Sequence, residues 1–405
     1  MFGTDSPEQA VRQVISEVRC RGDAALYDLT SKIDGVRLSS LEIGKEQIVG
    51  AYREVDSGLV SALNLAAERI RSFHQAQRDA LWGRTAKQGS GQLIRPLERV
   101  GIYAPGGSAS YPSTVLMTAI PARVAGVKEI ILVTPPGSSK AVPLSTLVAA
   151  DIAEVDRVFC VGGAQAIAAL AFGTESIPGV DKICGPGNIF VVLAKRLVYG
   201  VVDIDGLQGP SEVLIIADEA ANPGYCAADL LAQSEHDPLA SAILVTTSRR
   251  LADEVNLEIE RQLKDLPRRA IAAESLENNG RIVVVANVDE AIELANLYAP
   301  EHLCLMIDGA DSYVDRVTNA GGIFIGENST VALGDYVAGP SHVLPTGGTA
   351  RFSSPLNIGD FIKISNLVAV DKTGLKQLGS AASTIARAEG LDAHARAVER
   401  RLAGD

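Results

Sequence analysis

The histidines are the first residues in this 405-residue chain that point to chemistry, because there are only five of them. Four stand beside carboxylates, amides or glycine-proline turns: His236 in AQSEHDP, His302 in YAPEHL, His342 in GPSHVLPTGG and His394 in EGLDAH. Imidazole is the usual proton shuttle near neutral pH and a common metal ligand. Each histidine alone could be an ordinary surface or core residue, but four such contexts together favour a functional site. The fifth, His74, lies in the helical pattern SALNLAAERIRSFHQAQRDAL and is expected to be structural.

His236 has a polar neighbour at a spacing that indicates a shared face. Apolar residues recur at helical intervals from Tyr225 to His236, so Gln233 and His236, three residues apart, lie on one side of the expected helix. An amide oxygen and an imidazole nitrogen placed in this way could hold one metal ion. A polar helix end would show the same pair, so the motif alone leaves a metal site and an ordinary helix terminus both open.

Two carboxylates accompany the other histidines. Glu301 directly precedes His302, and neighbours on a helix or turn point about 100° apart, so the pair could act on different atoms of one substrate. A helix that starts at Pro300, with Glu301 near the positive end of its dipole, would explain the same motif. Asp335 falls in the glycine-rich stretch VALGDYVAGPSH, where a loop could bring its carboxylate and His342 into a cleft.

The C-terminal stretch LGSAASTIARAEGLDAHARAVERRL predicts two helices that break at Gly390, with Asp392 as the N-cap of the second. Glu389 and His394 therefore flank one tight turn. This tail, from about residue 372, is too short to bury a core of its own and must pack on another surface.

Short apolar runs that alternate with alanine-rich helical stretches supply the elements that must position these residues. They occupy residues 96–210 and again 211–371, which is typical of α/β domains with a parallel sheet. The expected strands are Val100–Tyr103, Glu129–Val133, Val158–Val161 and Lys182–Cys184 in the first domain, and EVLIIAD, AILVTT, RIVVVA, LCLMI and GGIFIG in the second. The sequence thus predicts an α/β protein with two Rossmann-like parallel-sheet domains, a helical N-terminal region over residues 1–95 and a short helical tail over 372–405.

Composition agrees with a cytoplasmic enzyme and argues against other classes. Lys plus Arg number 37 and Asp plus Glu 49, a net charge of −12, so a nucleic-acid-binding surface is not expected. Neither a secretion signal nor a membrane-spanning apolar run is visible, so no membrane association is expected. The cysteines are scattered without CxxC spacing, which favours reduced thiols in a reducing compartment over a disulfide framework or a cysteine-rich zinc site: Cys20, Cys160, Cys184, Cys226 and Cys304.

A dinucleotide site is not evident from motifs alone. The fingerprint GxGxxG, with an acidic residue about 20 positions later, is absent in that form. Three glycine turns between an expected strand and a helix are present instead: YAPGGS, VGGAQA and GPGN. Glycine there permits a close approach of the backbone to a phosphate, but many α/β turns look the same.

Taken in order, several motifs resemble those of the L-histidinol dehydrogenase family, whose members use zinc and NAD in the last steps of histidine synthesis. They are GPSEVLIIAD, AADLLAQSEHDP, YAPEHL, GDYVAGPSHVLPTGGTARFSS and EGLDAHARAVERR. The resemblance starts near Ala10, continues through RVGIYAPGGSASYPSTVLMTAIPARVAGVKEIILVTPP and VGGAQAIAALAFGTESIPGVDKICGPGN, and runs to the C-terminus. The same scaffold also occurs in sulfopropanediol dehydrogenases, so the motifs specify the superfamily more strongly than the substrate.

The resemblance implies roles for individual residues. One zinc ion per subunit would be held by Gln233, His236, Asp335 and His394. NAD would be contacted by Tyr103, Gln165 and Asn188. The substrate, L-histidinol, would be contacted by the zinc ligands together with Ser211, His302, His342 and Glu389. The tail would complete the site of a neighbouring subunit, which implies a homodimer with shared active sites.

The implied reaction has two oxidation steps, from L-histidinol through L-histidinaldehyde to L-histidine. His302 would take the alcohol proton as hydride leaves for NAD, and Glu301 would activate a water that attacks the aldehyde before a second NAD accepts the second hydride. The alternatives are an NAD-dependent dehydrogenase of another polar alcohol, such as a sulfopropanediol, and a zinc hydrolase in which Glu301 activates water. The absence of an H-E-x-x-H helix counts against the hydrolase.

A few positions depart from the family pattern and bear on the substrate. Gly206 and Gln208 stand where Met and Ala are commoner, and Ser341 stands where Asn usually precedes the histidine. The carboxylate of Glu389 would favour an imidazole or ammonium over a sulfonate, because like charges in one site repel. Arg351 favours the opposite substrate, since a guanidinium that points into the cleft could hold a sulfonate.

Overall fold

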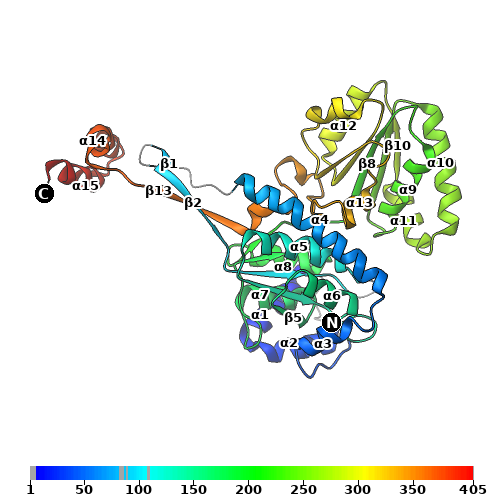
Figure 1. Ribbon diagram of the computed structural model, residues 1–405, viewed down its shortest axis with the longest axis horizontal. Helices are drawn as coiled ribbons and strands as arrows, with labels where there is room; N and C mark the ends of the chain where they lie inside the picture. The colour runs from blue at the N-terminus through cyan, green and yellow to red at the C-terminus, as the bar shows by residue number, and fades with distance from the viewer. Residues whose placement is uncertain (1–5, 82–85, 88–89, 107–109, 405) are drawn as a thin grey trace. The chain divides into compact units, whose positions relative to one another are not determined.

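The computed structural model describes residues 6–81, 86–87, 90–106 and 110–404 of the chain (Figure 1). The chain divides into two compact units, one made of Met1–Gln77 and Leu97–Phe361 and the other of Arg78–Pro96 and Ile362–Asp405. This division differs from the boundaries expected at residues 95 and 371. The reason is that residues 90–96 and 362–368 pair as antiparallel strands of one sheet, so both segments belong to the smaller unit.

A five-stranded parallel sheet in the order β5-β4-β3-β6-β7 forms the first part of the larger unit. Its strands are β3 (Arg99–Tyr103), β4 (Glu129–Thr134), β5 (Arg157–Cys160), β6 (Lys182–Cys184) and β7 (Asp203–Ile204). Counted along the chain from β3, the order is that of dinucleotide-binding folds, in which the direction of winding reverses beside the first strand. The connecting helices are α5 (Pro112–Ala125), α6 (Leu144–Ile152), α7 (Gly163–Phe172) and α8 (Ile189–Val198).

The N-terminal helices complete this first α/β part instead of forming a domain of their own. Val11 of α1 (Pro7–Arg21) and Leu26 of α2 (Asp23–Ile33) share one hydrophobic core with Phe159 of β5 and Ile167 of α7. Helix α3 (Lys45–Ala51) packs against α6. Helix α4 (Ser57–Leu81) carries the buried His74, whose Nδ1 lies 2.8 Å from Gln77 Oε1.

The second part of the larger unit is another parallel sheet, in the order β10-β9-β8-β11-β12. Its strands are β8 (Glu212–Ala217), β9 (Ser241–Thr246), β10 (Arg281–Val284), β11 (His302–Met306) and β12 (Gly322–Ile325). Figure 1 shows this sheet between α12 (Val288–Tyr298) on one side and α9 (Pro223–Ser234), α10 (Arg249–Gln262) and α11 (Arg269–Asn279) on the other.

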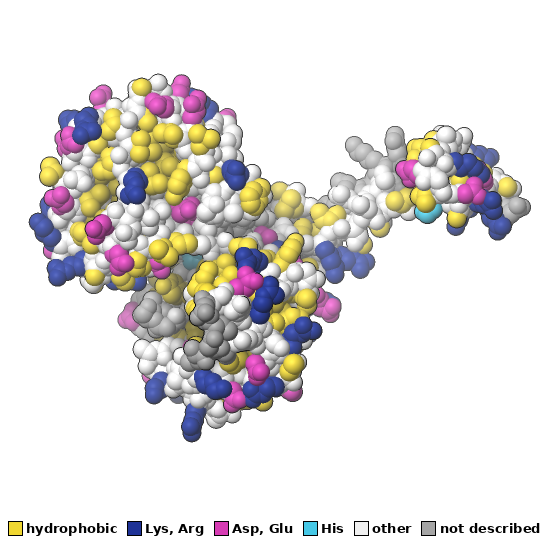
Figure 2. Space-filling model, turned by 180° about the vertical axis from the view of Figure 1, so that it is seen from behind, with side chains coloured by type: hydrophobic (Ala, Val, Ile, Leu, Met, Phe, Trp, Pro, Cys, Tyr) yellow, Lys and Arg dark blue, Asp and Glu magenta, His cyan; other side chains and the backbone are white. Residues whose placement is uncertain are grey.

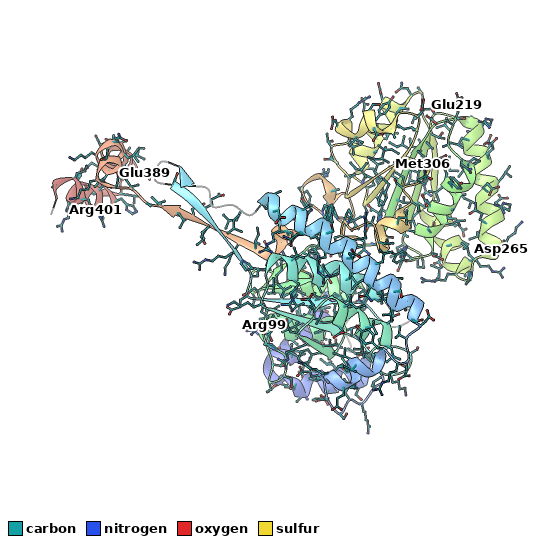
Figure 3. The ribbon with its side chains drawn as sticks, in the orientation of Figure 1. Arg99, Glu219, Asp265, Met306, Glu389 and Arg401 are labelled. Carbon is teal, nitrogen blue, oxygen red and sulfur yellow. The ribbon has the colours of Figure 1, made fainter. Side chains whose placement is uncertain are left out.

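Successive side chains of β11 point into the cores on opposite faces of this sheet. Cys304 and Met306, the latter labelled in Figure 3, belong to the core beneath α9 and α10, whereas Leu303 and Leu305 belong to the core beneath α12. Successive side chains of a strand point to opposite faces, so a strand that is apolar at every position must be buried on both sides. The short helices η1 (Leu263–Asp265), η2 (Ala310–Arg316), α13 (Val331–Tyr336), η3 (Thr349–Arg351) and η4 (Ile358–Phe361) complete the unit.

The expected fold class is confirmed: two parallel α/β sheets form, and every strand expected from the sequence is present with its ends shifted by at most a residue or two. Strand β7 was not expected, because Asp203–Ile204 is too short to show an apolar run. No helix in the described ranges is both long and apolar enough to cross a membrane.

The smaller unit consists of a three-stranded antiparallel sheet and a pair of helices. The sheet contains β1 (Ala86–Lys87), β2 (Ser90–Pro96) and β13 (Ile362–Val368), in that order. Helix α14 (Lys372–Ala388) and helix α15 (Asp392–Ala403) pack against each other, and Gly390 between them has a φ of 77°, as expected for a helix break. Asp392 is the first residue of α15 and not its N-cap, which is Leu391.

Candidate active site

Both α/β parts of the larger unit line one cavity of about 140 Å³. Thr114 and Pro186 come from the segments that follow the carboxyl ends of β3 and β6. Ser211 and Glu301 immediately precede β8 and β11, so the second part contributes the amino edge of its sheet. The cavity brings together these residues that the sequence indicated: Ser211, Gln233, His236, Glu301, His302, Asp335 and His342.

Glu301 and His302 lie at the start of a strand, so the alternative of a helix that begins at Pro300 is wrong. Helix α12 ends at Tyr298, and Ala299 takes a left-handed φ of 54° that turns the chain away from the helix. His302 is then the first residue of β11, whose five residues are all buried. The apolar run HLCLM therefore decides the local structure, and Pro300 only stops the preceding helix.

One peptide segment orients both of these side chains. The backbone N–H of Glu212 donates to Glu301 Oε2 over 2.8 Å, and the backbone oxygen of Glu212 lies 2.9 Å from His302 Nδ1. A carbonyl oxygen only accepts hydrogen bonds, so Nδ1 carries the proton of a neutral His302 and Nε2 keeps its lone pair. The start of β8 thus fixes the tautomer that leaves Nε2 free to act as a base.

The charge of His302 depends on two carboxylates. Its Nδ1 lies 3.4 Å from Glu301 Oε2, and its Nε2 lies 3.5 Å from Asp335 Oδ1. Burial lowers the pKa of His302, but Glu301 and Asp335 outweigh burial and raise the pKa to about 10. A cation held by Asp335 would offset part of this effect and favour the neutral imidazole. Asp335 itself lies on the short helix α13, not in a loop as expected.

His342 makes a hydrogen bond that the sequence did not indicate. Its Nδ1 donates to the backbone oxygen of Asp335 over 2.7 Å, and its Nε2 lies 3.3 Å from Thr114 Oγ1, which can therefore donate to it. Burial lowers the pKa of His342, which favours the neutral ring that this arrangement requires. Thr114 and Tyr111 are functional candidates that sequence reasoning missed, although they lie in the quoted segment SASYPSTVLMTA.

Three of the four expected zinc ligands lie on this cavity. Gln233 is in the last turn of α9 with 2 % exposure, and its Nε2 is buried without a hydrogen-bond partner. His236 follows the end of α9 and is exposed. The helix does not continue through this segment because Asp237 precedes a proline, and the residue before a proline disfavours the helical conformation. Within the described residues no three His, Cys, Asp or Glu side chains are grouped closely enough to hold a metal. Amide, imidazole and carboxylate donors without a thiolate nevertheless fit an open catalytic zinc site, provided that a fourth ligand joins them.

The expected NAD contacts lie at the carboxyl edge of the first sheet. Tyr103 ends β3, and its hydroxyl accepts from the backbone N–H of Gly163 over 3.2 Å. Gln165 lies in the first turn of α7, and its Nε2 is buried without a partner. Asn188 caps α8, with its Oδ1 accepting from the N–H groups of Phe190 and Val191. The turn YAPGGS is described only as far as Gly106, and Gly107 and Ser108 lie outside the described residues.

A buried ion pair ties together the two loops beside Asn188 and Ser211. Lys195 and Asp205 each have a side-chain exposure of 1 % and are paired. Lys195 Nζ also donates to Gly185 O over 3.0 Å and to Gln208 Oε1 over 3.1 Å, while Asp205 accepts from Gly185 N over 2.6 Å. Gln208, one of the departures from the family pattern, lines the cavity. Its amide thus joins the network that sets the position of the loop after β6.

Glu389 and His394 lie in the smaller unit, on a separate surface hollow of the helix pair. The hollow is lined mostly by apolar side chains, among them Ile385, Leu391 and Val398. Ile385 is 59 % exposed and Leu391 44 %. Figure 2 shows hydrophobic side chains on the surface of this helix pair, and Figure 3 labels Glu389 at the end of α14. Within the helix pair, an imidazole and a carboxylate therefore lie beside exposed apolar side chains.

The family model for histidinol dehydrogenase matches residues 3–402. The chain belongs to the histidinol dehydrogenase family. It is 60 % identical over 401 residues to a histidinol dehydrogenase from Dehalococcoides mccartyi, an alignment that covers 99 % of this chain and 92 % of the relative. It is 51 % identical over 402 residues to one from Halalkalibacterium halodurans, with 99 % and 95 % covered.

A solved histidinol dehydrogenase has the same fold. The crystal structure of the enzyme from Elizabethkingia anophelis matches with a TM-score of 0.95 at 38 % identity, and the match covers 100 % of this chain and 94 % of that one. The resemblance drawn from the motifs is therefore confirmed at the level of the family. Histidinol dehydrogenase sequences also match the tail that carries Glu389 and His394, since the family model extends to residue 402.

Proposed function

We propose that the chain oxidises L-histidinol through L-histidinaldehyde to L-histidine, with two molecules of NAD as hydride acceptors. The observation that carries the proposal is the cavity in which Glu301 and His302, oriented by one peptide segment, lie beside Gln233, His236 and Asp335. Histidinol dehydrogenases are NAD-dependent oxidoreductases, and membership of that family supports the same cofactor for this chain.

His302 is the base of the first step. Its Nδ1–H is held by Glu212 O, so Nε2 takes the proton of the alcohol while hydride passes from the carbinol carbon to NAD. The positive charge that this transfer creates on the ring is stabilised by Glu301, whose Oε2 lies 3.4 Å from Nδ1, and a cation held by Asp335 would keep the resting ring neutral so that Nε2 can accept the proton. The products of the step are the aldehyde and reduced NAD.

Glu301 is the base of the second step. Its carboxylate accepts a hydrogen bond from Glu212 N, which leaves its second oxygen available to take a proton from water. The water adds to the aldehyde carbon, and the resulting hydrate loses a second hydride to a second NAD as the acid forms. Because the side chain of Glu301 is 8 % exposed, competing bulk water is largely excluded from this reaction.

Zinc would be held by Gln233, His236 and Asp335 from this cavity. The fourth ligand would be His394 from the smaller unit of a neighbouring subunit. When bound, the ion supplies a positive charge that orients the polar groups of the substrate. Chelation of the purified protein should abolish turnover, and added zinc should restore it. Full activity in thoroughly metal-free protein would contradict this ligand set. Retained thermal stability of the metal-free chain is expected, because the ligands stand outside the three hydrophobic cores.

A second copy of the chain would complete the site with Glu389 and His394. The support is the exposed apolar hollow around these residues. The described part of α14 and α15 also has no substantial core, since only Gly379, Ser383 and Ala395 are buried there. Mixed samples of the inactive variants His302→Ala and His394→Ala should regain part of the activity when subunits exchange. No recovery despite demonstrated exchange would favour a site built within one chain.

The charge of the cavity favours histidinol over a sulfonated diol. Two carboxylates and three imidazoles line it, and no Lys or Arg is among its lining residues. Arg351, the residue that could have held a sulfonate, is exposed, donates from Nε to Gly348 O over 3.1 Å and does not line the cavity. In a direct competition of the two alcohols with NAD in excess, histidinol should have the higher kcat/KM. A higher value for the sulfonated diol would overturn the substrate and leave the NAD chemistry standing.

A further inference from the structure

The carboxyl edge of the first sheet holds a buried acidic group to which the proposed reaction gives no role. Asp34 directly follows α2 and is half-buried. Its Oδ2 is shielded from solvent and has no hydrogen-bond partner. Burial raises the pKa of this carboxyl group. A shielded acceptor without a partner destabilises a fold, so Asp34 is a candidate for a group that is satisfied by a ligand.

The neighbours of Asp34 place it over one half of the sheet. Burial raises the pKa of Tyr103 to about 12, the hydrogen bond from Gly163 opposes this, and the negative charge of Asp34 adds to it. Burial and then the charge of Asp34 raise the pKa of Cys160 to about 11. Tyr103 and Cys160 are the last residues of β3 and β5, and β4 runs between them. Asp34 therefore lies near the carboxyl ends of these three strands.

A donor without a partner lies at the same edge. Gln165 is 1 % exposed, and its Nε2 makes no hydrogen bond. Its side chain is near Gly163, where an added Cβ would meet Gln165 Oε1 at 2.8 Å, and Gly163 N donates to the Tyr103 hydroxyl. One buried acceptor and one buried donor thus remain unsatisfied near Tyr103. Vicinal hydroxyl groups can satisfy both, because each hydroxyl donates one hydrogen bond and accepts others.

The position of Asp34 can be compared with that of the ribose-binding acid in dinucleotide-binding folds, which this chain lacks at the usual place in its sequence. In folds with this strand order, a carboxylate at the end of the second strand binds the ribose hydroxyls of NAD. The second strand here is β4, and it is followed by Pro135-Pro136-Gly137, with no acidic residue. Asp34 brings a carboxylate to the same edge from the N-terminal helices, which lie outside the fingerprint.

A cavity lined by the segment that follows Asp34, from Val36 to Ser40, offers space for a base. Its volume is about 510 Å³, within the range of ligand pockets, and it lies on the β5 side of the sheet. Its lining includes Val36, Leu38, Val142, Leu147 and Cys160. The substrate cavity borders the loop after β6, on the other side of β3. A dinucleotide that crosses this edge would therefore place one end at the substrate and the other at Asp34.

We propose that Asp34 binds the ribose hydroxyls of the adenosine half of NAD and repels the 2′-phosphate of NADP. The inference rests on the proposed function in that NAD is the cofactor. Asp34 accepts from the 2′- and 3′-hydroxyls, Gln165 donates to a ribose oxygen, and the cavity lined by Val36 and Leu38 receives the adenine. A phosphate on the 2′ position would meet the carboxylate as a like charge in a partly shielded site.

The test compares Asp34→Asn with Asp28→Asn, a matched loss of charge on the same helix, where Asp28 pairs with Arg21 at the surface. The dissociation constants of NAD and NADP are measured by direct titration of the apo chain, and the ratio of kcat/KM for the two cofactors is measured with histidinol. Asp34→Asn should weaken NAD about ten-fold to a hundred-fold, the usual effect of losing a hydrogen bond to a charged group, and should reduce the preference for NAD. Asp28→Asn should change neither.

Two further results separate ligand binding from a structural role. The apo Asp34→Asn chain should melt no lower than the wild type, because the substitution removes an unpaired buried charge. Asp34→Glu keeps the charge and should keep the discrimination against NADP, even where the displaced carboxylate weakens NAD. Unchanged NAD affinity and an unchanged cofactor ratio in Asp34→Asn would overturn the inference and leave the function intact. A wild-type chain that binds no NAD would contradict the proposed function itself.

Discussion

The substitution Glu301→Gln should separate the two oxidation steps. Glutamine keeps the size of the side chain and an oxygen that accepts from Glu212 N, so the hydrogen bond of 2.8 Å and the start of β11 should be preserved. What disappears is the base. Oxidation of supplied histidinaldehyde should fall by about 10²–10⁴-fold, the usual effect of removing a general base.

The alcohol step should suffer less, for a reason that the geometry gives. Glu301 Oε2 lies 3.4 Å from His302 Nδ1 and is one of the two carboxylates that raise the pKa of that imidazole. Removing this anion lowers the pKa of His302 and increases the fraction of neutral base at neutral pH. The first step therefore keeps its base in the required form, although the positive charge that develops on His302 is less well stabilised.

Single-turnover measurements with histidinol and with histidinaldehyde would resolve the steps. Glu219→Gln, a loss of the same charge at an exposed position of the same α/β part (Figure 3), is the control and should change neither rate. Equal losses in both steps of Glu301→Gln would refute the division of labour. A circular dichroism spectrum and a melting temperature like those of the wild type would show that the losses are chemical.

Three further substitutions test other parts of the account. Lys195→Met leaves the buried Asp205 without its ion-pair partner, so thermal unfolding should show a loss of about 3–5 kcal/mol in stability. The KM for NAD should rise as the loop after β6 loosens, and an unchanged melting temperature would contradict the role of the pair. Thr114→Val removes the donor to His342 Nε2, so kcat/KM should fall about ten-fold with little change in secondary structure, and full activity would exclude that contact. Apo Asp34→Asn should melt above the wild type at neutral pH but not below pH 3.8, the ordinary pKa of the group. Burial raises the pKa of Asp34 in the folded state, so the wild-type carboxylate costs stability once the pH is high enough to ionise it. A gain that shrinks as the pH rises would show that Asp34 is stabilised by a partner in the fold.

Local sequence patterns were enough to predict the two sheets and most of the cavity. Buried strands of parallel sheets are apolar at nearly every position, so runs such as those of β4 and β11 are visible in the sequence. The polar residues that interrupt or flank these runs, Glu301 and His302 among them, stand out for the same reason. The motif at Pro300 was ambiguous only because proline both ends one helix and can begin another.

The contacts that could not be predicted join residues far apart in the chain. Thr114 meets His342 across 228 positions, and nothing in the sequence near either residue indicates the pairing. The orientation of His302 depends on a backbone oxygen, which carries no sequence signal at all. Strands β2 and β13 pair although residues 97–361 of the larger unit separate them in the chain, so the boundary of the smaller unit follows from tertiary pairing and not from composition.

The stoichiometry of the reaction tests the central claim most directly. The zinc-loaded chain is mixed with a limiting amount of L-histidinol and an excess of NAD, and reduced NAD is measured by its absorbance while the organic product is identified. The account predicts two molecules of reduced NAD for each histidinol, with histidine as the product and no accumulation of the aldehyde. One molecule of reduced NAD with aldehyde as the product would contradict the role of Glu301 in the second step, and no reduction of NAD would contradict the proposed function.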